Sequence, residues 1–116
     1  MATITQAMLV ERVLKHLRVY NAGETISAED DATVDEAIAD VHAELQELGL
    51  AYWDLSEIPQ SVVRGLVWMV GADAAPSFVS AEEVGSYMSL RKAGEQRIRT
   101  AVSNLKLHDI NPQLYY

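Results

Sequence analysis

The chain has 116 residues, no cysteine and a formal net charge of −8 at pH 7. This length fits one domain with a single core, and the lack of cysteine excludes disulfide bonds, cysteine-ligated zinc and a cysteine nucleophile. An acidic protein is repelled by nucleic-acid phosphates, so tight, groove-reading DNA binding is not expected. The sequence has neither a signal-peptide pattern nor an apolar run of about 18 residues, which predicts a soluble, cytosolic protein.

The acidic excess lies in the middle of the chain. Residues 1–20 contain three basic residues and one acidic residue, residues 21–63 contain eleven acidic and no basic residues, and residues 64–116 contain six basic and five acidic residues. A function for this chain therefore has to account for an acidic middle segment between two segments that carry all the basic residues.

The first helix is expected from Thr5, a suitable N-cap, to about Val19, because apolar residues recur on one face at helical spacing. Asn21 and Gly23 are expected to end it, since both residue types readily adopt left-handed backbone angles.

A second helix is expected from Ser27 to Gly49. Ser27 suits the N-cap, three acidic residues follow in the first turn, where the helix dipole favours them, and Gly49 suits the C-terminal turn. One seam is apolar, with Val34, Ile38, Val41, Leu45 and Leu48. The other side carries an acidic stripe of Glu36, Asp40, Glu44 and Glu47. Like-charge pairs of this kind cost about 0.2–0.5 kcal/mol each, so the stripe needs an explanation outside the helix.

Residues 50–59 form an irregular segment that is unusually apolar for a loop. Tyr52 and Trp53 have two interpretations. They plug one end of the helical core, since aromatic side chains bury a large area, or they form an exposed anchor for a partner, since both residue types are enriched at binding hot spots.

A third helix is expected from Gln60 to about Ala75, after Pro59, and it should be the most buried helix because it is apolar on more than one side. Gly65 and Gly71 permit close approach of a neighbouring helix, and Pro76 is expected to end this one.

A capping box, Ser80 to Glu83, opens a fourth helix that should run to about Leu107, with Gly85 and Gly94 as candidate bends. Its solvent side carries basic residues at seven-residue intervals, namely Lys92, Arg99 and Lys106, together with Arg91 and Arg97. These basic residues and the acidic stripe either meet within one subunit, remain solvated, or meet between subunits of a ring.

The last residues, 108–116, show no periodicity but end in Leu114, Tyr115 and Tyr116. Disordered tails are usually poor in such residues, so we expect the tail to dock on its own domain or on another protein. The sequence therefore predicts an all-α fold: a small bundle of about four helices in residues 1–107 and an extended C-terminal tail in residues 108–116.

No catalytic motif is found in the sequence. It has no phosphate-binding glycine loop and no Gly-x-Ser-x-Gly elbow. His16, His42 and His108 lie on three different segments without the spacing of a zinc site. We predict no catalytic, metal-binding or cofactor-binding residues, and an enzyme is not expected.

The order of these parts resembles the head-to-tail connector, or adaptor, proteins of tailed bacteriophages, also called head completion or tail accessory proteins. Three stretches carry the resemblance: MLVERVLKHLRV; EDDATVDEAIADVHAELQEL followed by YW; and IPQSVVRGLVWMVGADAAPSFV. With the start of the fourth helix they cover roughly residues 5–90.

The resemblance implies a four-helix subunit in a homo-oligomeric ring, commonly dodecameric, at the virion neck. The protein would be made in the host cytoplasm, contact the portal protein above and a stopper or tail protein below, and let double-stranded DNA pass through the central channel without sequence preference. No cofactor or membrane is implied. The acidic stripe would face the channel or an adjacent subunit that presents Lys92, Arg99 and Lys106. Docking to the portal or another partner would involve Tyr52, Trp53, Leu114, Tyr115 and Tyr116.

Two alternatives remain. The first is a small acidic regulatory or DNA-mimic protein that binds a basic groove on a DNA-binding enzyme, which the eleven acidic residues of 21–63 favour. The second is a helix-turn-helix regulator, which fits less well because acidic residues interrupt the basic residues of the fourth helix.

Overall fold

The computed structural model describes residues 2–21 and 23–114, with side chains as far as residue 105. In these residues the chain forms four helices and two short strands: β1 (Thr3–Ile4), α1 (Gln6–His16), α2 (Ala28–Glu47), β2 (Ile58–Pro59), α3 (Gln60–Phe78) and α4 (Ala81–Leu114). The predicted all-α class with four helices is confirmed. The tail predicted at residues 108–116 lies outside the described side chains and stays a prediction.

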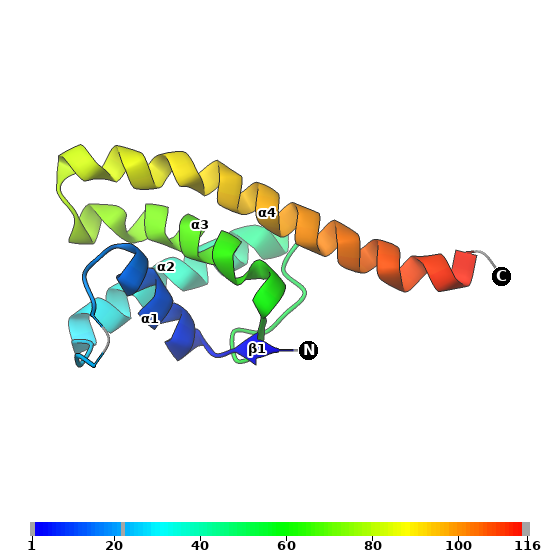
Figure 1. Ribbon diagram of the computed structural model, residues 1–116, viewed down its shortest axis with the longest axis horizontal. Helices are drawn as coiled ribbons and strands as arrows, with labels where there is room; N and C mark the ends of the chain where they lie inside the picture. Colours follow the sequence, from blue (N-terminus) through cyan, green and yellow to red (C-terminus); the bar gives the residue numbers. More distant parts are fainter. Residues whose placement is uncertain (1, 22, 115–116) are drawn as a thin grey trace.

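The helices are arranged around α3 (Figure 1). The long helix α4 runs antiparallel along one side of α3, α1 crosses in front, α2 lies behind, and the C-terminal part of α4 extends past the other helices. The molecule measures 55 × 27 × 22 Å along its principal axes. Within the described residues, no helix combines the length and the apolar character needed to cross a membrane.

Helix α3 is the most buried helix, as predicted, with eleven of its 19 residues buried. The α2 seam packs on it through four of its five predicted residues, Val34, Ile38, Val41 and Leu45. Leu48 is 45% exposed instead. Helix α4 contributes Ile98 and Val102 to the same core. The core therefore lies between α3 and the three other helices.

The N-terminal caps of α1 and α2 are those the sequence predicts. The Thr5 Oγ1 accepts a hydrogen bond from the Met8 amide at 3.3 Å, and the Ser27 Oγ accepts one from the Asp30 amide at 3.1 Å. Gly49, with φ of 74°, follows the C-cap of α2 as expected.

The predicted end of α1 is wrong: the helix ends at His16, several residues before Asn21 and Gly23. Arg18 adopts the left-handed conformation there, with φ of 63°. The Val19 amide then donates to the Leu14 carbonyl and the Arg18 amide to the Lys15 carbonyl, both at 3.0 Å. This pair of bonds is a Schellman motif, and it satisfies the carbonyl groups that the end of the helix leaves free.

Pro76 does not end α3, contrary to the prediction, because the helix continues to Phe78. Pro76 lies in the last turn and lacks only the amide that would bond to the carbonyl four residues earlier. The Val79 amide donates to the Ala75 carbonyl at 2.9 Å and closes the turn. A proline this close to a helix end removes one hydrogen bond and leaves the next ones in place.

The strands β1 and β2, which the sequence analysis did not predict, pair antiparallel with Ile4 opposite Ile58. Both isoleucines are buried, so this short pairing fixes the residues before α1 against the start of α3. Two residues per strand are too few for the alternating pattern by which strands are recognised in a sequence.

Candidate functional site

The acidic stripe of α2 is divided in the folded protein. Glu36, Asp40 and Glu47 are exposed, whereas Glu44 is partly buried. These three exposed carboxylates lie on the side of α2 away from its buried seam, and Glu36 and Asp40 also border a groove between α2 and α3. The three carboxylates form the acidic outer face of α2.

Glu44 binds Arg91 of α4. The Arg91 Nη2 lies 2.9 Å from the Glu44 Oε1, and the Arg91 Nε lies 2.8 Å from the Asp73 Oδ1 on α3. The hydrogen bonds from Arg91 to Asp73, which has the larger effect, and to Glu44 raise the pKa of the guanidinium above its ordinary value. Arg91 therefore joins α4 to both α2 and α3.

Lys92 and Arg99, two of the basic residues predicted to face the acidic stripe, take other positions. Lys92 is exposed, and the Arg99 Nε pairs with the Glu95 Oε2 one turn earlier on α4, at 3.1 Å. Lys106 lies outside the described side chains. In the part of the chain that the structure describes, the contact between a stripe residue and α4 is made by Arg91, which was predicted on the basic side of the fourth helix but not as a site residue.

Tyr52 and Trp53 have different environments. Trp53 is 6% exposed and belongs to the core, whereas Tyr52 is 53% exposed. Their rings meet edge to face with centroids 5.3 Å apart. Trp53 therefore plugs the end of the core, and Tyr52 remains at the surface. Leu114, Tyr115 and Tyr116 lie outside the described side chains.

The two described histidines are half-buried and lie apart. Burial lowers the pKa of His16. It also lowers the pKa of His42, where the nearby Asp54 carboxylate opposes the effect. Within the described residues, no cluster of three or more His, Asp or Glu side chains is placed to hold a metal ion.

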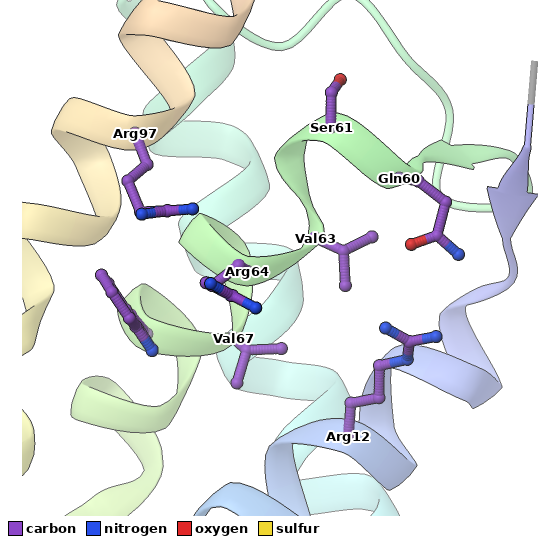
Figure 2. A pocket seen from close by; sticks show the side chains of 8 residues that line it. Arg12, Gln60, Ser61, Val63, Arg64, Val67 and Arg97 are labelled. Atoms are coloured by element: carbon purple, nitrogen blue, oxygen red, sulfur yellow. The ribbon is translucent and has the colours of Figure 1, made fainter.

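A basic hollow of about 550 Å³ lies between α1, α3 and α4. We call it the arginine hollow, because Figure 2 shows Arg12 from α1, Arg64 from α3 and Arg97 from α4 approaching it from three helices. The remaining lining residues are Gln60, Ser61, Val63, Val67 and Trp68. The three arginines are distant in sequence, so only the packing of the helices brings them together.

The arginines of the hollow are placed to bind an anion. The Arg97 guanidinium lies over the Trp68 ring, 5.3 Å from its centroid, a cation–π contact that holds it at the edge of the hollow. Among the described residues, neither Arg12, Arg64 nor Arg97 forms an ion pair. A guanidinium group offers planar, paired donors that match a carboxylate or a phosphate.

The arginine hollow was not predicted from the sequence. One local signal was available: Arg64 is the single basic residue of α3, and Trp68 follows it one turn later. Arg12 and Arg97 could be added only from the three-dimensional structure.

The acidic and basic surfaces lie on opposite sides of α3. Arg64 and Asp73 are nine positions apart, and at about 100° per residue this spacing places them about 180° apart around the helix axis. A smaller hollow of about 220 Å³ on the Asp73 side is also lined by Glu36 and Asp40. The protein is therefore basic on the side of the arginine hollow and acidic on the side of α2.

Comparison of the chain with models of known protein families, with curated proteins and with solved structures finds no match. The fold and the surfaces define the class: a small all-α domain with an acidic face on one side and a basic hollow on the other.

Proposed function

We propose that this protein is a structural head-to-tail connector of a tailed phage, which forms a ring below the portal, joins capsid to tail and lets DNA pass through its centre. The observation that carries the proposal is the separation of charge across α3, with Arg64 on one side and Asp73 and the acidic outer face of α2 on the other. The order of sequence parts described above supports it, and no catalytic role is proposed.

Charge separation suits a ring because a ring uses two different surfaces of each subunit. When one surface of a subunit binds a different surface of the next subunit, the same contact can repeat from subunit to subunit. The chain of subunits closes into a ring if the rotation between neighbours divides evenly into a full turn. Carboxylates that are not used in such contacts suit a DNA channel, because they repel phosphates at short range and leave the duplex free to slide.

Docking to the portal is proposed for the apolar groups at the surface. Leu48 and Tyr52 are 45% and 53% exposed, and both lie at the end of α2 and the start of the following loop. Exposed aromatic and aliphatic groups of this kind are typical anchors in protein interfaces. Leu114, Tyr115 and Tyr116 are proposed to insert into the portal.

Native mass spectrometry tests the proposal, with the protein alone and then mixed with the portal protein encoded beside it. We expect the portal to take up a full ring of copies. Deletion of residues 109–116 should weaken this uptake. A portal that takes up no copies of the full-length chain would contradict the connector function.

A triple variant tests the acidic outer face of α2. Glu36→Lys, Asp40→Lys and Glu47→Lys together should disturb ring assembly or DNA passage. The matched control reverses three exposed acidic residues elsewhere, Glu24, Glu57 and Glu82, with the same change in net charge. Equal infectivity and ring assembly for both variants would remove the role of the α2 face.

The alternative function is that of a small acidic regulator that binds a basic groove on a DNA-binding enzyme. The row of exposed carboxylates on α2 favours it. This alternative predicts a monomer or dimer that competes with DNA for its partner, whereas the connector predicts a higher ring on the portal, so the same mass-spectrometry experiment separates the two.

A further inference from the structure

We propose that the arginine hollow binds the acidic outer face of α2 on a second copy of this chain, with Glu36 and Asp40 entering the hollow. The inference deepens the proposed function, on which it rests, by naming the contact between neighbouring subunits. It replaces Lys92, Arg99 and Lys106 of the sequence analysis with Arg12, Arg64 and Arg97 as the basic partners.

The hollow favours an anion for an electrostatic reason. Three guanidinium groups border one hollow of about 550 Å³, and none of them has an ion-pair partner in the described part of the chain. Like charges that approach one another repel, and a carboxylate between them replaces this repulsion with paired, charge-assisted hydrogen bonds. Trp68 adds a flat apolar wall on which Arg97 is already placed.

The spacing of the α2 carboxylates fits such a site. Glu36 and Asp40 are four residues apart and both exposed, so they are neighbours on the helix surface, with about 5–6 Å between their Cβ atoms. Two adjacent carboxylates on a rigid helix can therefore engage two arginines of the hollow at once. Neither carboxylate forms an ion pair within the described residues of its own chain.

Charge favours a second copy over nucleic acid as the occupant. The chain carries a net charge of −8, and a duplex, which is negative along its whole length, would lie beside the acidic parts of the protein as well as the hollow. On a second copy, three exposed carboxylates gather on the acidic outer face of α2. At physiological salt, repulsion between the two net charges is screened beyond about 8 Å, whereas direct contacts are screened less.

The position of the two surfaces determines the form of the assembly. Because the hollow and α2 lie on opposite sides of α3, each copy that uses its hollow still has its own acidic face free. The contact is therefore heterologous, and it continues from copy to copy instead of ending at a two-fold dimer.

Cysteine cross-linking tests the contact, because the natural chain contains no cysteine. One variant is Ser61→Cys, in the lining of the hollow, and the other is Ala43→Cys, exposed on the outer side of α2 between Asp40 and Glu47. With a short bismaleimide, the mixture of both variants should form cross-linked dimers, and each variant alone should not. Cross-links within either single variant, or none in the mixture, would overturn the proposal.

Charge reversal gives the matched controls. Arg64→Glu with Arg97→Glu, placed in the Ser61→Cys chain, should abolish the cross-link, whereas Arg18→Glu with Lys92→Glu should leave it unchanged. When Glu36→Arg and Asp40→Arg are added to the Ala43→Cys chain, the cross-link to the Ser61→Cys chain with the reversed arginines should return. A restored cross-link shows that the reversed chain is still folded. A cross-link that persists after the reversal of Arg64 and Arg97 contradicts the inference. If the same reversal abolishes the binding of a labelled DNA duplex while the cross-link persists, the hollow binds nucleic acid and the inference is likewise overturned.

The portal experiment separates this inference from the proposed function. A ring on the portal without the predicted cross-link would leave the connector function standing and remove the role of the hollow. The predicted cross-link without any uptake by the portal would leave the contact standing and remove the connector function.

Discussion

Gly65 of α3 and Gly94 of α4 face each other where the two helices cross. A Cβ placed on Gly65 would lie 2.6 Å from the Gly94 carbonyl oxygen, and a Cβ placed on Gly94 would lie 2.7 Å from the Gly65 carbonyl oxygen. Real Cβ atoms do not approach backbone oxygens this closely, so both positions require glycine. This close approach holds α4 against the core. It thereby also positions Arg91 and Arg97, which lie on α4.

Substitution of Gly94 by alanine should destabilise the protein despite the better helix propensity of alanine. The gain in propensity is about 1 kcal/mol, but the new methyl group collides with backbone, and overpacking of this kind costs about 1–3 kcal/mol. We expect a net loss of up to about 2 kcal/mol in the free energy of unfolding, measured by urea denaturation.

Gly85→Ala is the matched control on the same helix. No atom lies within 4 Å of a Cβ at Gly85, so only the propensity changes, and the protein should gain about 0.5–1 kcal/mol. The same sign for both variants would show that α4 does not pack on α3 through Gly94.

The Arg91 network should contribute more to stability than the Arg99–Glu95 ion pair of α4. Arg91 binds two carboxylates from two other helices, and its side chain is 25% exposed. Its partner Glu44 is 40% exposed, so solvent weakens the interaction. We expect Arg91→Met to cost about 1 kcal/mol and Arg99→Met, which removes only the pair with Glu95, about 0.3–0.5 kcal/mol. Equal costs in urea denaturation would contradict this ranking.

The local parts of the fold could be predicted from the sequence. Ser27 and Gly49 fix the ends of α2 through hydrogen bonds that depend on neighbouring residues only. The end of α1 could not be predicted, because Arg18 takes a backbone conformation that its residue type disfavours, and it does so where Leu17 enters the core. The end of α3 was also predicted wrongly, because Pro76 lies in the last turn, where it removes one hydrogen bond and the Val79 amide still closes the turn on Ala75.

The candidate site was harder to predict than the fold. The acidic outer face of α2 follows from helical spacing, and three of its four predicted residues are exposed. The fourth, Glu44, is bound by Arg91, which lies 47 positions away. The arginine hollow likewise joins residues from three helices, and no periodicity within one segment indicates which basic residues will meet.

Arg18→Gly should stabilise the protein. Arg18 is exposed and has φ of 63°, a conformation that costs an L-residue about 1–2 kcal/mol and glycine little. Part of this gain is offset, because glycine also loses more backbone entropy on folding, so we expect an increase of about 0.5–1 kcal/mol in the free energy of unfolding. Arg18→Ala is the control, since it removes the side chain and keeps the strain. If alanine stabilises as much as glycine, the backbone conformation is not the cause.

Loss of His16 should make the protein less sensitive to mild acid. The His16 imidazole packs edge to face on Tyr87 with ring centroids 5.2 Å apart, and burial lowers its pKa from the ordinary 6.5. The unfolded chain therefore binds a proton at a higher pH than the folded chain does. The stability linked to neutral His16 is fully present above pH 6.5 and is lost as the pH falls through the lower, folded-state pKa.

The measurement compares the free energy of unfolding of the natural chain with that of His16→Gln, by urea denaturation at pH 7.5 and again below 6.5. Carboxylates titrate in both proteins, so the difference between the two proteins isolates the histidine. The natural chain should lose more stability than the variant on acidification. His42→Gln should reduce the loss less, because the Asp54 carboxylate opposes the lowering of the His42 pKa. Parallel pH profiles for the natural chain and His16→Gln would show that His16 titrates alike in the folded and unfolded states.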